Sequence, residues 1–273
     1  MTDNFIIAAL LTLFAGLSTG IGSAIAFFTK RTNTKLLSYI LGFSAGVMIY
    51  VSFIEIFPTA LEEFALSFSE KQSLFYTISS FFAGMLMIAL IDKFIPSMEN
   101  PHEVRSVEDM RDEKKEAKFN RLYRMGILTA IALAIHNFPE GIATFMSALN
   151  DPEVGVAIAI AIAIHNIPEG IAVSVPIYYA TGSRKKAFLL SFSSGLAEPL
   201  GGVLAYLVIM PFLTTATSGI VTGIILSAVA GIMVFISLDE LLPTAEEYGE
   251  HHLSIYGVVS GMIVMAMSLF ILV

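Results

Sequence analysis

The feature that most constrains this fold is a series of long apolar runs. A helix needs about 20 apolar residues to cross a hydrocarbon core roughly 30 Å thick. The sequence has eight such runs, at approximately 5–28, 37–61, 74–95, 122–149, 153–180, 187–212, 218–243 and 253–273. The sequence lacks the alternating pattern of membrane-barrel strands, so helices are the remaining spanning structure. We predict an all-α polytopic membrane protein with eight transmembrane helices, in which residues 1–273 form a single domain.

Composition supports this class and excludes others. Charged residues make up 14% of the chain, against about 25% in a soluble domain, and the mean hydropathy is +0.78. The net charge is −8 and no basic patch is interleaved with aromatic residues, so we expect no nucleic-acid partner. There are no cysteines, which rules out a disulfide framework and a zinc-thiolate site. The first apolar run is too long for a signal-peptide core, and we expect it to be a retained helix.

The basic residues predict the orientation. Of the 15 Lys and Arg residues, all but Lys71 fall between the first and second, third and fourth, or fifth and sixth runs. Loops rich in Lys and Arg stay in the cytoplasm. We therefore predict a multi-pass protein of the plasma (inner) membrane with both termini outside the cytoplasm. The charged segment at about 97–120 is expected to be a flexible cytoplasmic loop, and His251 and His252 are expected in a solvated loop.

An internal repeat is visible. The segment 46–62 matches 231–247 at a constant offset, including a shared E-x-x-P-T-A block that begins at Glu55 and Glu240. A weaker match pairs 16–28 with 195–207. Five helices separate the copies, an odd number, so the second copy enters the membrane from the opposite side. We predict an inverted repeat of helices 1–3 and 6–8 around central helices 4 and 5, an arrangement typical of secondary transporters with a midplane substrate site.

A second repeat carries the chemistry. The fourth run contains HNFPEG at 136–141 and the fifth contains HNIPEG at 165–170. In each, His and Glu are four residues apart and share one helix face. Two such helices facing each other supply two imidazoles and two carboxylates, a sufficient set of ligands for zinc or another divalent first-row ion. The residues with this role are His136, Glu140, His165 and Glu169, and the amides of Asn137 and Asn166 suggest a second, more oxygen-rich position beside them.

Proline and further acids extend this pattern. Pro139 and Pro168 each remove one helical hydrogen bond inside the membrane, which is tolerated where a helix is buried in protein or lines a wet cavity. Glu198 also precedes a proline and is predicted as a ligand of the second position, because intramembrane acids are functional by default. Glu55 is a candidate ligand as well, with an interfacial position as the alternative. For Glu240 the interfacial interpretation is favoured.

Two other classes of function are weighed. An intramembrane metal-dependent enzyme would be signalled by HExxH or by more histidines than the five present. A proton-coupled carrier of another solute would need recognition groups such as an intramembrane Lys or Arg, and none lies in the interior of a predicted span. We expect a transporter of divalent metal ions rather than an enzyme, with no catalytic cofactor.

These motifs resemble the ZIP (Zrt/Irt-like) family of divalent metal transporters. The resemblance rests on HNFPEG, HNIPEG, SGLAEPLGG at 194–202 and SFIEIFPTAL at 52–61, and it covers nearly the whole chain outside the loop at 97–120. It implies zinc uptake into the cytoplasm, with Fe²⁺, Mn²⁺ and Cd²⁺ as further candidate ions. It also implies a homodimer in the lipid bilayer.

The resemblance further implies a binuclear site. His136, Glu140, His165 and Glu169 would form the primary zinc position. Asn137, Asn166 and Glu198 would form the second, with Glu140 and Glu169 bridging the two. Glu55 falls where many relatives carry His or Met, and a carboxylate there favours iron or manganese alongside zinc. The loop at 97–120 is His-rich in many relatives but holds only His102 here, which argues against a metal-sensing role.

Overall fold

The structure is a computed structural model that describes residues 2–25, 34–94, 115–209, 211, 217–248 and 251–272. These residues form helices joined by short turns, and no strand occurs among them. The elements, with η for π-helical segments, are α1 (Thr2–Ile25), α2 (Thr34–Val51), η1 (Ser52–Ile56), α3 (Phe57–Ala65), α4 (Glu70–Phe94), α5 (Lys115–Asn150), α6 (Pro152–Thr181), α7 (Arg184–Gly195), α8 (Ala197–Leu204), η4 (Ala205–Ile209), α9 (Ser218–Ile236), η6 (Ser237–Leu241), α10 (Leu242–Tyr248) and α11 (His251–Leu272).

The described helices agree with the predicted class of membrane protein. Seven stretches are long and apolar enough to span a bilayer: 4–24, 38–65, 70–91, 152–171, 184–209, 218–241 and 252–271. The remaining predicted span, at 122–149, lies within the single helix α5. This helix begins at Lys115, inside the segment predicted as a flexible loop at 97–120. The reason is local, since Lys115 to Lys118 are Lys, Glu and Ala, which favour helices. Residues 97–114 lie outside the described part of the chain.

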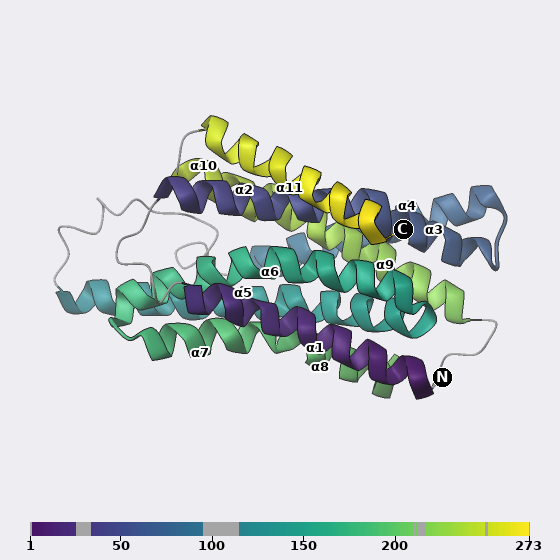
Figure 1. Ribbon diagram of the computed structural model, residues 1–273, viewed down its shortest axis with the longest axis horizontal. Helices are drawn as coiled ribbons and strands as arrows, with labels where there is room; N and C mark the ends of the chain where they lie inside the picture. The colour runs from purple at the N-terminus through teal and green to yellow at the C-terminus, as the bar shows by residue number, and fades with distance from the viewer. Residues whose placement is uncertain are drawn as a thin grey trace.

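The helices form two bundles that lie side by side (Figure 1). The first, termed the site bundle, contains α1, α5, α6, α7 and α8, which pack on one another. The second, termed the opposite bundle, contains α2, α3, α4, α9, α10 and α11. Contacts of α2 with α6 and of α5 with α9 join them. In Figure 1, α1 begins and α11 ends toward the same end of the molecule.

Close glycine contacts reveal the pseudo-two-fold relation between the repeats. A Cβ added to Gly16 would overlap the carbonyl oxygen of Gly195, and one added to Gly195 would meet the carbonyl oxygen of Gly16. These two glycines are partners in the sequence match of 16–28 with 195–207. Gly lets backbones approach this closely because it has no Cβ. The repeat partners therefore touch each other where the two copies meet.

The helix pairings follow the same symmetry. Helix α1 packs on α6 and α8 packs on α5, whereas α2 packs on α11 and α9 packs on α4. The π-helical segments η1 and η6, at Ser52–Ile56 and Ser237–Leu241, occupy matching positions of the repeat. Because π-helical turns are rare and concentrate at functional positions, their recurrence indicates that both copies of the repeat keep the same local backbone conformation. Glu55 and Glu240 lie in these π-helical turns.

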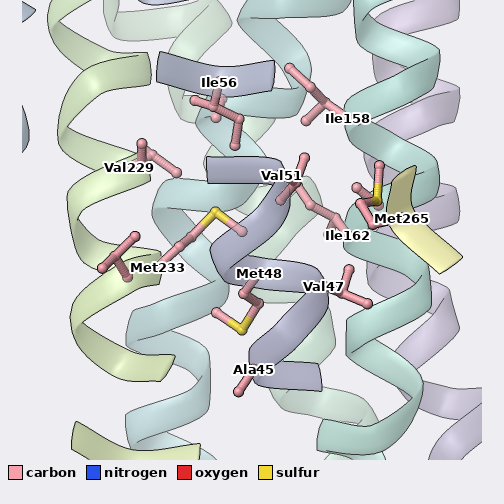
Figure 2. Close-up of a cluster of buried hydrophobic side chains, with 14 of the residues drawn as sticks. Ala45, Val47, Met48, Val51, Ile56, Ile158, Ile162, Val229, Met233 and Met265 are labelled. Atoms are coloured by element: carbon pink, nitrogen blue, oxygen red, sulfur yellow. The ribbon is translucent and has the colours of Figure 1, made fainter. Parts of the chain in front are cut away.

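Apolar side chains fill the space between the bundles. Val47, Met48 and Val51 of α2 lie beside Ile158 and Ile162 of α6, with residues of α9 and α11 around them (Figure 2). All five are fully buried. Each such side chain contributes roughly 1.5–3 kcal/mol when it is taken out of water, although less in a lipid-surrounded protein. The interface between the bundles is therefore close-packed but carries little directional bonding along this stretch.

Candidate metal centre

Helices α5 and α6 carry the two HNxPEG segments through the interior of the site bundle. Both remain helical through Pro139 and Pro168, so the loss of one hydrogen bond at each proline does not interrupt them. The glycine after each Glu sets the spacing to the neighbouring helix. A Cβ on Gly141 would collide with the backbone of Glu198, and a Cβ on Gly170 would collide with that of Thr19. The same motif thus brings α8 against α5 and α1 against α6.

The polar residues of these segments are buried. Asn137, Glu140, His165 and Asn166 have no exposed surface, and Glu169 is 3% exposed. Uncompensated carboxylates in such surroundings cost several kcal/mol each. A protein retains them in this position when protons, hydrogen bonds or a cation offset that cost.

The carboxylates and the imidazole approach one another. Nε2 of His165 lies 3.3 Å from Oε2 of Glu140, a contact that joins α6 to α5. The carboxylate of Glu198, fully buried on α8, interacts electrostatically with those of Glu140 and Glu169. Three acids and one imidazole predicted from the sequence therefore lie in the same region of the site bundle.

The two asparagines bond in the same way. Nδ2 of Asn166 donates to the carbonyl oxygen of Ala15 at 2.9 Å and also donates to Oε1 of Glu198. Nδ2 of Asn137 donates to the carbonyl oxygen of Ser194 at 3.5 Å. Ala15 and Ser194 are repeat mates, so the pattern is symmetric. In both cases the amide nitrogen anchors the side chain to a neighbouring helix.

Several oxygen and nitrogen atoms at this place make no hydrogen bond within the described part of the chain. They are Oδ1 of Asn137, Oδ1 of Asn166, Nδ1 of His165 and Oε2 of Glu198. Buried polar atoms are almost always satisfied by protein or water. All four have lone pairs or can acquire one by a tautomer change, so they are suited to accept a cation.

A break in the sixth span positions Glu198. Helix α7 ends at Gly195 and α8 starts at Ala197. Pro199 lacks the N–H that would bond the carbonyl of Gly195, and here, unlike at Pro139 and Pro168, the helix is interrupted, with Leu196 between α7 and α8. Glu198 consequently lies in the first turn of α8, where the positive end of the helix dipole stabilises a carboxylate.

Of the remaining predicted ligands, one is not described and one lies apart from this group. The side chain of His136 lies outside the described residues. Glu55 is half-buried in η1, and its charged neighbour is Glu62 rather than the acids of α5, α6 and α8. Among the described side chains, no three His, Asp or Glu residues are arranged closely enough to hold a metal ion.

Sequence reasoning missed one polar contact at this place. The hydroxyl of Ser44 on α2 donates to the carbonyl oxygen of His165 at 3.3 Å, so a residue of the opposite bundle contacts the backbone of a candidate ligand. A lone Ser in an apolar run carries no motif. The only sequence signal was its position in the second predicted span, nine residues before Phe53 of the repeat segment 46–62.

Taken together, the described helices and their seven membrane-capable stretches define a multi-pass membrane protein, with an imidazole, carboxylates and amides buried between its helices. Residues 96–269 match the family described as ZIP zinc transporter. The chain is 64% identical to "Zinc transporter ZupT" of Lysinibacillus sphaericus, with all of both chains covered. It is 62% identical to the protein of that name from Oceanobacillus iheyensis over 99% of each chain, and 60% identical to that of Streptococcus mutans over the full length of both. The chain belongs to the ZIP family of metal transporters and resembles its ZupT members throughout.

Proposed function

We propose that this protein imports zinc through the site bundle and holds the ion at a binuclear site. The carrying observation is the buried set of Glu140, His165, Asn166, Glu169 and Glu198 on three helices of one bundle. The curated relatives are named as zinc transporters, which supports zinc as the cargo. Fe²⁺, Mn²⁺ and Cd²⁺ are proposed as further cargo ions.

The primary position would be formed by His136, Glu140, His165 and Glu169. The contact of His165 with Glu140 supports this assignment, because it brings ligands from α5 and α6 together. Imidazole and carboxylate are ordinary zinc ligands.

The second position would be formed by Asn137, Asn166 and Glu198, with Glu140 and Glu169 shared between the two. Its donors would all be oxygens, which suit harder ions such as manganese and iron(II). The free Oδ1 atoms of the two asparagines support this arrangement.

Charge balance favours cations at this place. Three carboxylates lie in one buried region, and protons or metal ions must offset their mutual repulsion. Metal and protons therefore compete for the same oxygens. Protonation of Glu140, Glu169 or a ligating His would aid release of the ion.

The basic residues support the proposed orientation. Lys35 stands near the start of α2, and Arg184 to Lys186 begin α7. In Figure 1 both helices start at the end away from the start of α1. The positive-inside rule assigns that end to the cytoplasm. We propose the plasma (inner) membrane with both termini outside, and a homodimer as the assembled form.

Glu55 is proposed as an additional ligand or gate on the path to the site. It lies half-buried in a π-helical turn on the helix that also carries Ser44. Its carboxylate would attract a divalent cation before the ion reaches the carboxylates of α5 and α6.

Zinc uptake by proteoliposomes tests the function. The wild type, Glu169→Ala and the matched control Glu153→Ala are compared, since Glu153 lies exposed in the first turn of the same helix. Saturable zinc influx in the wild type and in Glu153→Ala, lost in Glu169→Ala, supports the proposal. Tight zinc binding by the wild type without flux would instead indicate a receptor or an enzyme, and would refute transport.

A further inference from the structure

One side chain links the two bundles at the end where α5 meets α6. Nδ2 of Asn150, the last residue of α5, donates to Oε1 of Glu63 on α3 and to Oγ1 of Thr222 on α9, both at 3.2 Å. Helix α5 belongs to the site bundle, whereas α3 and α9 belong to the opposite bundle. These three residues are termed the clasp.

The clasp differs from most contacts near the middle of the molecule, where the hydrogen bond from Ser44 to the carbonyl oxygen of His165 is the directional contact described above. There, Val51 of α2, Ile158 of α6 and Met233 of α9 pack together as apolar side chains (Figure 2). Apolar packing is non-directional, so it permits the bundles to shift against each other. Hydrogen bonds have preferred distances and angles, so the clasp favours one relative position of the bundles at this end.

The sequence repeat does not carry the residue types of the clasp at the matching positions. The repeat mates of Asn150, Glu63 and Thr222 in the sequence are Tyr179, Tyr248 and Leu37. None of these types supplies an amide donor or a carboxylate acceptor. A symmetric repeat would make the two ends equivalent in energy, and the clasp makes them unequal.

We propose that Asn150 holds the α5–α6 end of the transporter shut, and that its bonds to Glu63 and Thr222 break each time this end opens to admit metal. The proposal rests on the proposed transport function, because it assigns the clasp to a step in which the bundles move apart. Rigid-body movement of one bundle against another is the general mode by which inverted-repeat carriers expose their site. In the orientation proposed above, this end faces outward.

Crosslinking tests the need for opening. The chain has no cysteine, so Asn150→Cys with Glu63→Cys introduces one defined pair. A short, membrane-impermeant, reducible bis-methanethiosulfonate reagent joins the two in proteoliposomes. We expect zinc influx to fall at least tenfold after crosslinking and to return after reduction.

A matched pair controls for the reagent. Nδ2 of Asn4 donates to the carbonyl oxygen of Leu149 at 3.1 Å, which joins α1 to α5 at the same end but within the site bundle. Crosslinked Asn4→Cys with Leu149→Cys should retain influx within twofold. Unchanged influx in the crosslinked clasp pair, or equal loss in both pairs, overturns the proposal.

Accessibility gives a readout that does not need transport. Ile158 is fully buried between the bundles, and Ile158→Cys should react with an impermeant maleimide only when they separate. Adding Asn150→Ala should raise the labelling rate about five- to tenfold, since two hydrogen bonds are lost. Adding Glu63→Gln should change it less than twofold, because Gln keeps Oε1 as an acceptor. A labelling rate unmoved by Asn150→Ala overturns the clasp. Absence of zinc influx in the wild type refutes only the proposed function.

Discussion

The glycines that follow the two intramembrane glutamates allow packing and metal binding to be separated. In Gly141→Ala, the new Cβ would lie 2.6 Å from Cα of Glu198, whereas ordinary contacts begin at 3.4 Å. The atoms in the way are backbone, so no rotamer change can relieve the overlap. The carbonyl oxygen of Glu198 is closer still, so α5 and α8 would have to separate by more than about 0.8 Å, the difference between those two distances, whereas ligand distances tolerate only about 0.2 Å. We expect loss of the second metal position.

Gly170→Ala is the symmetry-matched comparison. Its Cβ would meet the carbonyl oxygen of Thr19 and lie 3.1 Å from the carbonyl carbon of that residue. Thr19 is the repeat mate of Glu198 but carries no carboxylate. Overpacking should cost each variant about 1–3 kcal/mol of stability, so their unfolding temperatures in detergent should fall by similar amounts.

Zinc titration calorimetry of the purified protein distinguishes the two. We expect two zinc ions per chain for the wild type, one or fewer tight sites for Gly141→Ala, and a smaller loss of second-site affinity for Gly170→Ala. Gly20→Ala serves as the mild control, because its Cβ would meet only the ring of Phe192. Wild-type zinc stoichiometry and affinity in Gly141→Ala would refute the placement of Glu198 in the site.

Three further predictions follow from the same contacts. Asn166→Ala removes the donor that fixes Glu198 and should weaken zinc binding about 10- to 100-fold by calorimetry; unchanged affinity would contradict a positioning role. Pro199→Ala supplies the N–H donor that the carbonyl of Gly195 lacks, so amide hydrogen exchange between residues 196 and 200 should slow and zinc affinity should fall. Exchange as fast as in the wild type would count against proline as the cause of the break. Zinc affinity should decrease as pH falls, because protons compete for the carboxylates and imidazoles, and a pH-independent binding curve would argue against these ligands.

The sequence was sufficient for the helices and for the buried polar residues of α5, α6 and α8. The length of an apolar run that crosses the membrane depends only on the thickness of the bilayer, so the spans could be predicted from the sequence alone. The spacing of His165 and Glu169 depends only on helix geometry. Glu198 was found because an acid is costly in a membrane and therefore conspicuous. These inferences required no knowledge of how the helices pack.

What escaped prediction depends on packing between distant residues. Asn137 and Asn166 were predicted as oxygen donors, but nothing in the motif indicates that their nitrogens would bond the carbonyls of Ser194 and Ala15. The clasp joins residues 87 positions apart. In the sequence, Asn150 at the end of a helix resembles an ordinary loop residue. Its partner Glu63 can be identified only when the position of α3 beside α5 is known. The same holds for Ser44.

The repeat explains why the proposed metal site is asymmetric. The pseudo-two-fold relation exchanges α5 with α6 and the asparagines with each other, so the primary position can lie near the axis with equal contributions from both helices. Glu198 breaks that symmetry, because its mate Thr19 offers a neutral hydroxyl. The proposed second position would therefore lie off the axis, on the side of α8. The clasp breaks the symmetry again, at the α5–α6 end. An inverted repeat with identical copies would give two end states of equal energy, and Glu198 and the proposed clasp are two places at which this chain departs from that symmetry.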